Sequence, residues 1–188
     1  FRFLMFSSTS FVAVGQDSSF HNSTGSSNVA VGYAALQENT ASNNTAVGYT
    51  ALLNNTTGAD QVAVGRKALL DNTTGGYNTA VGVNALQNNT TADYNTAVGN
   101  SALDQNTTGS QNTSCGMQGL RDNTTGNNNT AVGLNALKLN TTASNNTAAG
   151  RNALTTNTTG ETNTAVGESA LSLNTTGTSN TAVGKSAL

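Results

Sequence analysis

The stretch "DNTTGGYNTAVGVNALQNNTTADYNTAVGNSALDQNTTG", residues 71–109, contains one 17-residue unit more than twice. Its motif N-T-A-V-G ends at Gly82 and again at Gly99. A glycine of this motif or a close variant recurs along the whole chain, with one step of 16 residues among steps of 17. A fixed period of this kind is typical of repeat proteins, so we expect one repeat domain over residues 11–188. The glycines are Gly15, Gly32, Gly48, Gly65, Gly82, Gly99, Gly116, Gly133, Gly150, Gly167 and Gly184.

Each unit holds two short apolar stretches, T-A-V and A-L, which lie between glycine and asparagine turn signals. The apolar residues do not follow the i, i+3, i+4, i+7 spacing of an amphipathic helix. The pattern therefore predicts an all-β fold: a parallel β-solenoid, or β-roll, of about eleven 17-residue coils. Coils that stack at the usual strand spacing would form a rod roughly 50 Å long.

Stacking turns each position of the unit into a column of side chains. We expect the valine of T-A-V and the leucine of A-L to face the interior, with small alanines such as Ala80 and Ala85 beside them. The motif glycine is expected at a corner with positive φ, which glycine adopts without steric cost. The predicted core residues are Val31, Val47, Val64, Val81, Val98, Val132, Val166, Leu36, Leu52, Leu69, Leu86, Leu103, Leu137, Leu154 and Leu171.

Two asparagine columns accompany this core, one in N-T-A-V-G and one in N-T-T-G. Stacked amides can donate to one coil and accept from the next, and Asn also suits turns. We predict structural Asn ladders. They comprise Asn78, Asn95, Asn129, Asn146 and Asn163 in the first column, and Asn72, Asn89, Asn106, Asn123, Asn140 and Asn157 in the second.

N-T-T is also an N-glycosylation sequon. A glycan on every coil would be crowded at a spacing of about 4.8 Å, so dense N-glycosylation is not expected. The first threonine of N-T-T forms a further candidate column for surface contacts or small sugars. Its members are Thr56, Thr73, Thr90, Thr107, Thr124, Thr141, Thr158 and Thr175.

Charged residues make up 9% of the chain and the net charge is −2, which leaves no basic footprint for nucleic acid. No apolar run is long enough to span a membrane. Apolar residues recur at two variable positions, and such columns favour packing against another chain. They include Leu53, Leu70, Leu139 and Leu173, which follow the A-L segment, and Tyr33, Tyr49, Val83 and Leu134, which fall just after the motif glycine.

No residue pattern supports catalysis, a metal site or a cofactor. His21 is the only histidine and is expected in a surface loop, while Cys115 replaces a column valine and is expected to be buried. Asp60, Asp93 and Glu161 share a turn region without forming a contiguous carboxylate column. We therefore expect a protein that is not an enzyme.

Residues 1–10, "FRFLMFSSTS", depart from the repeat and are expected to act as a cap or an inter-subunit segment. The final "AVGKSAL" stops within a unit, which would leave a sheet edge open. Either this chain is a piece of a longer one, or the start of one subunit completes the last coil of the next, which would give head-to-tail assembly as one form of self-association.

The recurring N-T-A-V-G with small residues and Asn-Thr turns resembles the head repeats of the YadA-like trimeric autotransporter adhesins. It is also similar to NTAVG arrays of bacterial surface proteins and phage tail fibres. The resemblance covers residues 11–188 and implies a parallel β-roll, usually trimeric, displayed outside the cell or on a virion. It also implies that Val81 faces the interior and Asn78 lies at the corner. The unit here is longer by A-L-x-x-N-T-T-G.

The leading functional interpretation is an extracellular structural fibre module with an adhesive surface that binds glycans or host receptors. Regularly spaced threonines make ice binding an alternative, although N-T-T ends in a turn rather than in a T-x-T strand. A phage tail-fibre segment is a further alternative. A tailspike that cleaves carbohydrate would need paired carboxylates on one face, and no such pair recurs.

Overall fold

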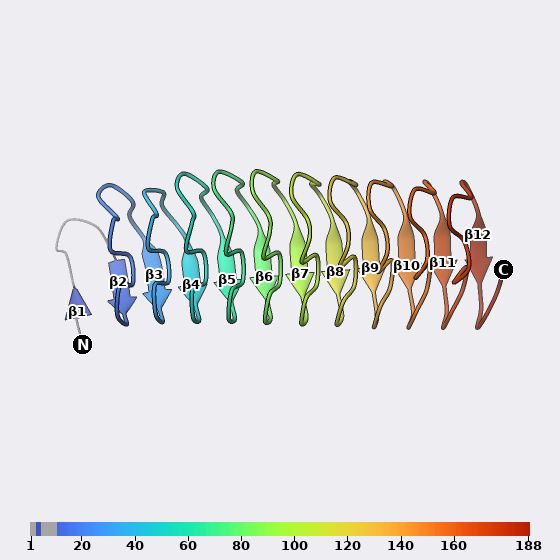
Figure 1. Ribbon diagram of the computed structural model, residues 1–188, viewed down its shortest axis with the longest axis horizontal. Coiled ribbons are helices and arrows are strands. Elements are labelled where there is room, and N and C mark those ends of the chain that lie inside the picture. Colours follow the sequence, from blue (N-terminus) through green and yellow to red (C-terminus); the bar gives the residue numbers. More distant parts are fainter. Residues whose placement is uncertain (1–2, 5–10) are drawn as a thin grey trace.

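The computed structural model describes residues 3–4 and 11–188, which form a parallel β-solenoid. Strands β2 to β12 pair in sequence order within one sheet, one strand per coil, and no helix occurs in the described residues (Figure 1). The strands are β1 (Phe3–Leu4), β2 (Phe11–Val14), β3 (Asn28–Val31), β4 (Thr45–Val47), β5 (Val62–Val64), β6 (Thr79–Val81), β7 (Thr96–Val98), β8 (Thr113–Cys115), β9 (Thr130–Val132), β10 (Thr147–Ala149), β11 (Thr164–Val166) and β12 (Thr181–Val183). The predicted fold class is confirmed.

Equivalent residues of successive units lie side by side in the sheet. Thr79 pairs with Thr96, and Ala80 with Ala97. The single step of 16 residues causes no slip, because Ala30 still pairs with Ala46. Every column named from the sequence is therefore a physical row of side chains along the rod.

The N-terminal edge of the sheet is covered by β1, which runs antiparallel to β2 and places Leu4 opposite Ala13. The predicted capping role of the side chains of residues 1–10 lies outside the described residues.

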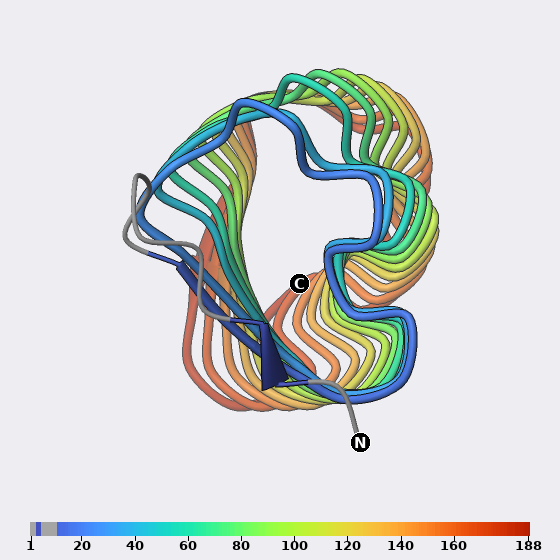
Figure 2. The same cartoon turned by 90° about the vertical axis from the view of Figure 1, so that its left-hand side faces the viewer.

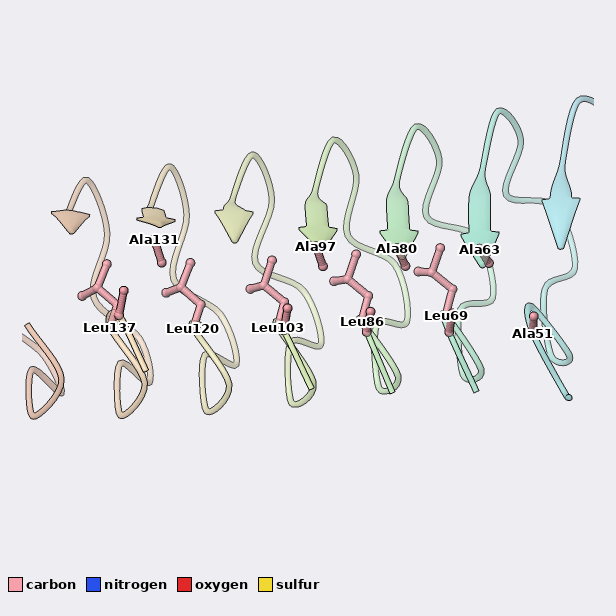
Figure 3. Close-up of a cluster of buried hydrophobic side chains, with 14 of the residues drawn as sticks. Ala51, Ala63, Leu69, Ala80, Leu86, Ala97, Leu103, Leu120, Ala131 and Leu137 are labelled. Atoms are coloured by element: carbon pink, nitrogen blue, oxygen red, sulfur yellow. The ribbon is translucent and has the colours of Figure 1, made fainter. Parts of the chain in front are cut away.

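The interior is a narrow row of leucines and alanines. Leu86 and Leu103 have no exposed surface, and neither have Ala80 and Ala85 of the same coil as Leu86. The predicted leucine column is confirmed as core. Figure 3 shows its members in one row beside the strand alanines, among them Leu69, Leu86, Leu103, Leu120, Leu137, Ala63, Ala80, Ala97 and Ala131.

The prediction that the valine column faces the interior was wrong. Successive residues of a strand point to opposite faces, so the inward Ala of T-A-V forces Thr and Val outward. Leucine from the opposite segment fills the narrow coil, and the inward position of the strand is occupied by alanine, or by serine at Ser114. Val31, Val47, Val64 and Val81 are half-buried, whereas Val98, Val132 and Val166 are 37%, 44% and 40% exposed.

The corners close through left-handed backbone. The motif glycine has a positive φ in every coil, as predicted, with 137° at Gly99. The buried leucine is also left-handed, with 53° at Leu103, as is the residue two positions before it, Ser101 at 52°. This conformation costs an L-residue about 1–2 kcal/mol. Hydrogen bonds between coils hold it, such as that from the Leu103 N–H to the Gly119 carbonyl at 3.0 Å.

Viewed along the rod axis, the coils follow nearly the same outline, and each is turned slightly relative to the one before (Figure 2). This is the twist expected of a sheet of L-residues.

Candidate functional site

The asparagine of N-T-T-G forms a continuous side-chain ladder. The Nδ2 of Asn106 donates to Oδ1 of Asn89 at 2.9 Å, and the Nδ2 of Asn123 donates to Oδ1 of Asn106 at 2.8 Å. Each Nδ2 also donates to the carbonyl three residues later, at 2.9 Å for Asn106 and Gly109. These side chains are fully buried, so the predicted ladder is confirmed. It includes the predicted residues Asn72, Asn89, Asn106, Asn123, Asn140 and Asn157.

The asparagine of N-T-A-V-G bonds mainly to backbone. The Oδ1 of Asn95 accepts from the N–H of Asn112 at 2.9 Å, and its Nδ2 donates to the carbonyl of Gly109 at 2.9 Å. This column therefore links side chain mainly to main chain of the next coil, and an amide-to-amide bond is added at places such as Asn163, whose Nδ2 donates to Oδ1 of Asn146 at 3.2 Å. Asn78, Asn95, Asn129, Asn146 and Asn163 all follow the pattern, with Gln61 in the place of one asparagine.

The asparagine ladder of the N-T-T-G turn determines whether the Nδ2 atoms of its sequons are free to carry a glycan. An N-linked glycan needs the Nδ2 atom, and the side chains from Asn55 to Asn157 in the turn column are buried, with Nδ2 donating two hydrogen bonds. In the folded solenoid these nitrogens are structural groups.

The first threonine of N-T-T also connects coils. The Oγ1 of Thr90 donates to the carbonyl of Thr107 at 3.1 Å, and that of Thr107 to Thr124 at 3.0 Å. Most members of this predicted contact column are half-buried, and its hydroxyl protons are already used. The second threonine is exposed in each of these turns, which moves the candidate contact column by one residue. The exposed threonines are Thr57, Thr74, Thr91, Thr108, Thr125, Thr142, Thr159 and Thr176.

A further ladder, which sequence reasoning missed, lies two residues before the first asparagine column. The N–H of Asp93 donates to Oγ of Ser110 at 3.1 Å, the N–H of Ser110 to Oδ1 of Asn127 at 2.7 Å, and the N–H of Asn127 to Oγ of Ser144 at 3.0 Å. The residue type varies, but each side chain supplies an oxygen. A search for acceptor oxygens rather than for one residue type would have found this column.

The outer face of the sheet carries two columns, the residue before and the residue after the inward alanine. In β7 these are Thr96 and Val98, both exposed. Cys115 belongs to the second column and is exposed, so the expectation that it is buried was wrong for the same reason as for the valines.

The predicted surface columns of apolar residues divide between exposed and half-buried positions. Tyr33 and Tyr49 are exposed and stack with ring centroids 5.2 Å apart, and Leu173 is exposed. A second pair, Tyr77 and Tyr94, stacks at 5.0 Å. Val83, Leu134, Leu53 and Leu70 are half-buried, while Leu139 is exposed.

Ionisable groups lie apart from one another or pair on the surface. His21 is exposed, with Nδ1 2.8 Å from Glu38, and Arg151 pairs with Glu168, which holds the pKa of that carboxyl below its usual value. Burial raises the pKa of Asp104. Within residues 3–4 and 11–188, no three His, Cys, Asp or Glu side chains gather closely enough to hold a metal ion.

Asp60, Asp93 and Glu161 do not form a cluster of this kind, and Asp93 accepts from the N–H of Gly76. No helix of the described part is long and apolar enough to cross a membrane. Comparison with protein-family models, with characterised proteins and with solved structures found no match to this chain.

Proposed function

We propose that the chain is a rigid structural module of an extracellular fibre, displayed on a cell or virion. The observation that carries the proposal is the repetition of the same bonds from coil to coil. The buried asparagines of the turn ladder are satisfied through neighbouring coils, as Asn106 is through Asn89 and Asn123. In such a stack, each coil is held mainly by contacts with the coils on either side of it.

The exposed second threonines support an adhesive surface. From Thr57 onward they recur once per coil, at about the 4.8 Å strand spacing. Weak contacts to a glycan or receptor at many such sites add through effective concentration. The YadA-like resemblance of the repeat favours the same setting, and a trimer or a head-to-tail filament would be its assembled form.

The test is immunogold labelling of the cells or particles that make the protein, with an antibody raised against the folded rod. We expect gold on filaments or projections outside the surface. Labelling confined to the interior of intact cells would contradict the proposal. Small-angle scattering should give a straight rod roughly 50 Å long for this segment.

Ice binding is the second candidate, because the strand threonines and valines form a regular outward array. The turn of each coil relative to the last makes this array twisted, whereas an ice plane is flat, so the fibre is favoured (Figure 2). Thermal hysteresis at high protein concentration would favour ice binding over the fibre function.

A further inference from the structure

The outer face of the sheet is a continuous surface of stiff, uncharged side chains. Its positions in β2 to β12 are the residues immediately before and after the inward Ala or Ser, and all but Cys115 and Ala149 are Val or Thr. β-Branched side chains have few χ1 rotamers, so covering them costs little conformational entropy.

No charge would be desolvated if this face were covered. The charged residues of the described part lie in other columns, such as the column just after the motif glycine, and Asp60 two residues before Val62. There the C-terminal charges pair with one another: Glu168 bonds to Arg151 and lies 3.7 Å from the Nζ of Lys185. Several of its valines are exposed, among them Val98 at 37% and Val132 at 44%, while Val47, Val64 and Val81 are half-buried.

The spacing of the face points to its occupant. The side chains repeat at the strand spacing of about 4.8 Å along the rod, and a second copy presents the same row at the same spacing. Two sheets with the same twist can also pack face to face with aligned strands. A partner with another period would meet only a few coils in register.

The area fits a weak, specific pair. Eleven coils make a strip roughly 50 Å long and about 10 Å wide, or about 500 Å² on each copy. The total of roughly 1,000 Å² is at the lower limit of specific protein interfaces. Pairing is therefore expected to depend on protein concentration.

We propose that this face, the outward Thr and Val columns of β2 to β12, is a lateral interface with a second copy of the chain. The pairing is sideways, so it does not depend on what either end of the rod contacts. It also does not require the extracellular role proposed above.

Sedimentation of the intact protein over a range of concentrations tests the proposal. We expect a two-chain particle that dissociates on dilution. The double variant Val98→Lys, Val132→Lys should shift the midpoint of association at least tenfold to higher concentration. Thr108→Lys, Thr142→Lys adds the same charge near the same coils on the exposed turn column, and it should associate like the parent. A parent that stays monomeric, or equal loss in both variants, overturns the interface.

Cys115 gives a second readout that needs no variant, because it lies on the proposed interface and is the only cysteine. Its rate of reaction with a thiol reagent should fall at least tenfold between dilute and associated protein. Association without protection of Cys115 would place the contact elsewhere and overturn the proposal. Monomeric rods that show thermal hysteresis would mean that the outer face binds ice, and this result would also overturn the proposed interface.

Discussion

At the scale of single residues, the two glycine columns differ in what they tolerate. A Cβ on Gly99 would lie 2.6 Å from the Gly116 carbonyl oxygen, and Gly99 also has φ of 137°. A Cβ on Gly109 would meet the Gly126 oxygen at 2.4 Å, yet its column holds alanine at Ala92 and Ala143, both buried. Small backbone shifts therefore admit a methyl group in the second column, whereas every unit keeps glycine in the first.

We accordingly expect Gly99→Ala to lower the free energy of unfolding by about 3 kcal/mol, from the strained φ and the backbone clash. Gly109→Ala should change it by less than about 1 kcal/mol. Urea denaturation of both variants measures this difference. Equal losses would mean that the left-handed corner is not what the first column requires.

Asp104 predicts a pH dependence of stability. Its pKa is raised chiefly by burial, against the hydrogen bond from Gln105 and the charge of Arg121. A carboxyl whose folded pKa is raised stabilises the fold below its ordinary pKa, and this contribution is lost as pH rises through the folded pKa. Asp104→Gln, which copies Gln87 of the same column, should raise the melting temperature at pH 7 and not at pH 3. A lower melting temperature at pH 7 would show that the favourable charge of Arg121 outweighs the cost of burying the Asp104 carboxylate.

At the scale of elements, β8 carries a coupled departure from the repeat. Ser114 replaces the inward alanine and donates to the Gly119 carbonyl at 2.8 Å. Gly119 replaces the alanine across the coil, and a Cβ there would lie 2.5 Å from Oγ of Ser114. The larger residue on one side is thus matched by the smaller one opposite.

Gly119→Ala alone should destabilise the protein by about 1–3 kcal/mol through overpacking. Adding Ser114→Ala restores the alanine pair of the other coils and should recover the loss. A double-mutant cycle by thermal denaturation gives the coupling energy, expected to be about 1–3 kcal/mol. Additive effects would show that the two positions do not share space.

The turn ladder makes a prediction of its own. Asn106→Ala removes the donor to Asn89 and the acceptor for Asn123 in a buried site, so we expect a loss of about 2–4 kcal/mol. Thr108→Ala removes the same sequon at an exposed side chain, and it should cost less than about 0.5 kcal/mol. Chemical denaturation of protein made in a host without N-glycosylation compares the two. Similar losses would argue against the ladder.

The sequence repeat predicted which residues share a column. It did not predict which face of the coil every column takes, because that depends on how the coil closes. The period assigns Asn106 and Leu103 to columns, and their chemistry tells which column is a ladder and which is core. The period does not say which face Val98 takes. The small Ala97 between Thr96 and Val98 was the available sign, since one residue of T-A-V must face inward where only alanine fits.

The positions with left-handed backbone could not be predicted from the sequence, for a different reason. Ser101 and Leu103 have positive φ, although neither residue type favours it. Only the path of the closed coil and its bonds to the next coil require it. Local propensity therefore gives no signal at these positions.

At the scale of the whole molecule, stability should be nearly a sum over coils and their neighbouring contacts. The described residues of each coil from β2 onward bond mainly to the coils on either side, in the register that pairs Ala80 with Ala97. One coil can therefore be removed if the columns stay aligned, because the new neighbours present the same groups.

Deletion of residues 83–99 joins Gly82 to Asn100 and removes one whole unit. We expect a folded rod shorter by about 4.8 Å, with the far-ultraviolet circular dichroism of the parent. Deletion of residues 83–90 removes about half a unit and is the matched control, because it places turn residues where the next coil presents a strand. Small-angle scattering and thermal denaturation should find the first variant cooperative and the second locally unfolded. If both unfold alike, coils are not interchangeable and the rod folds as one indivisible unit.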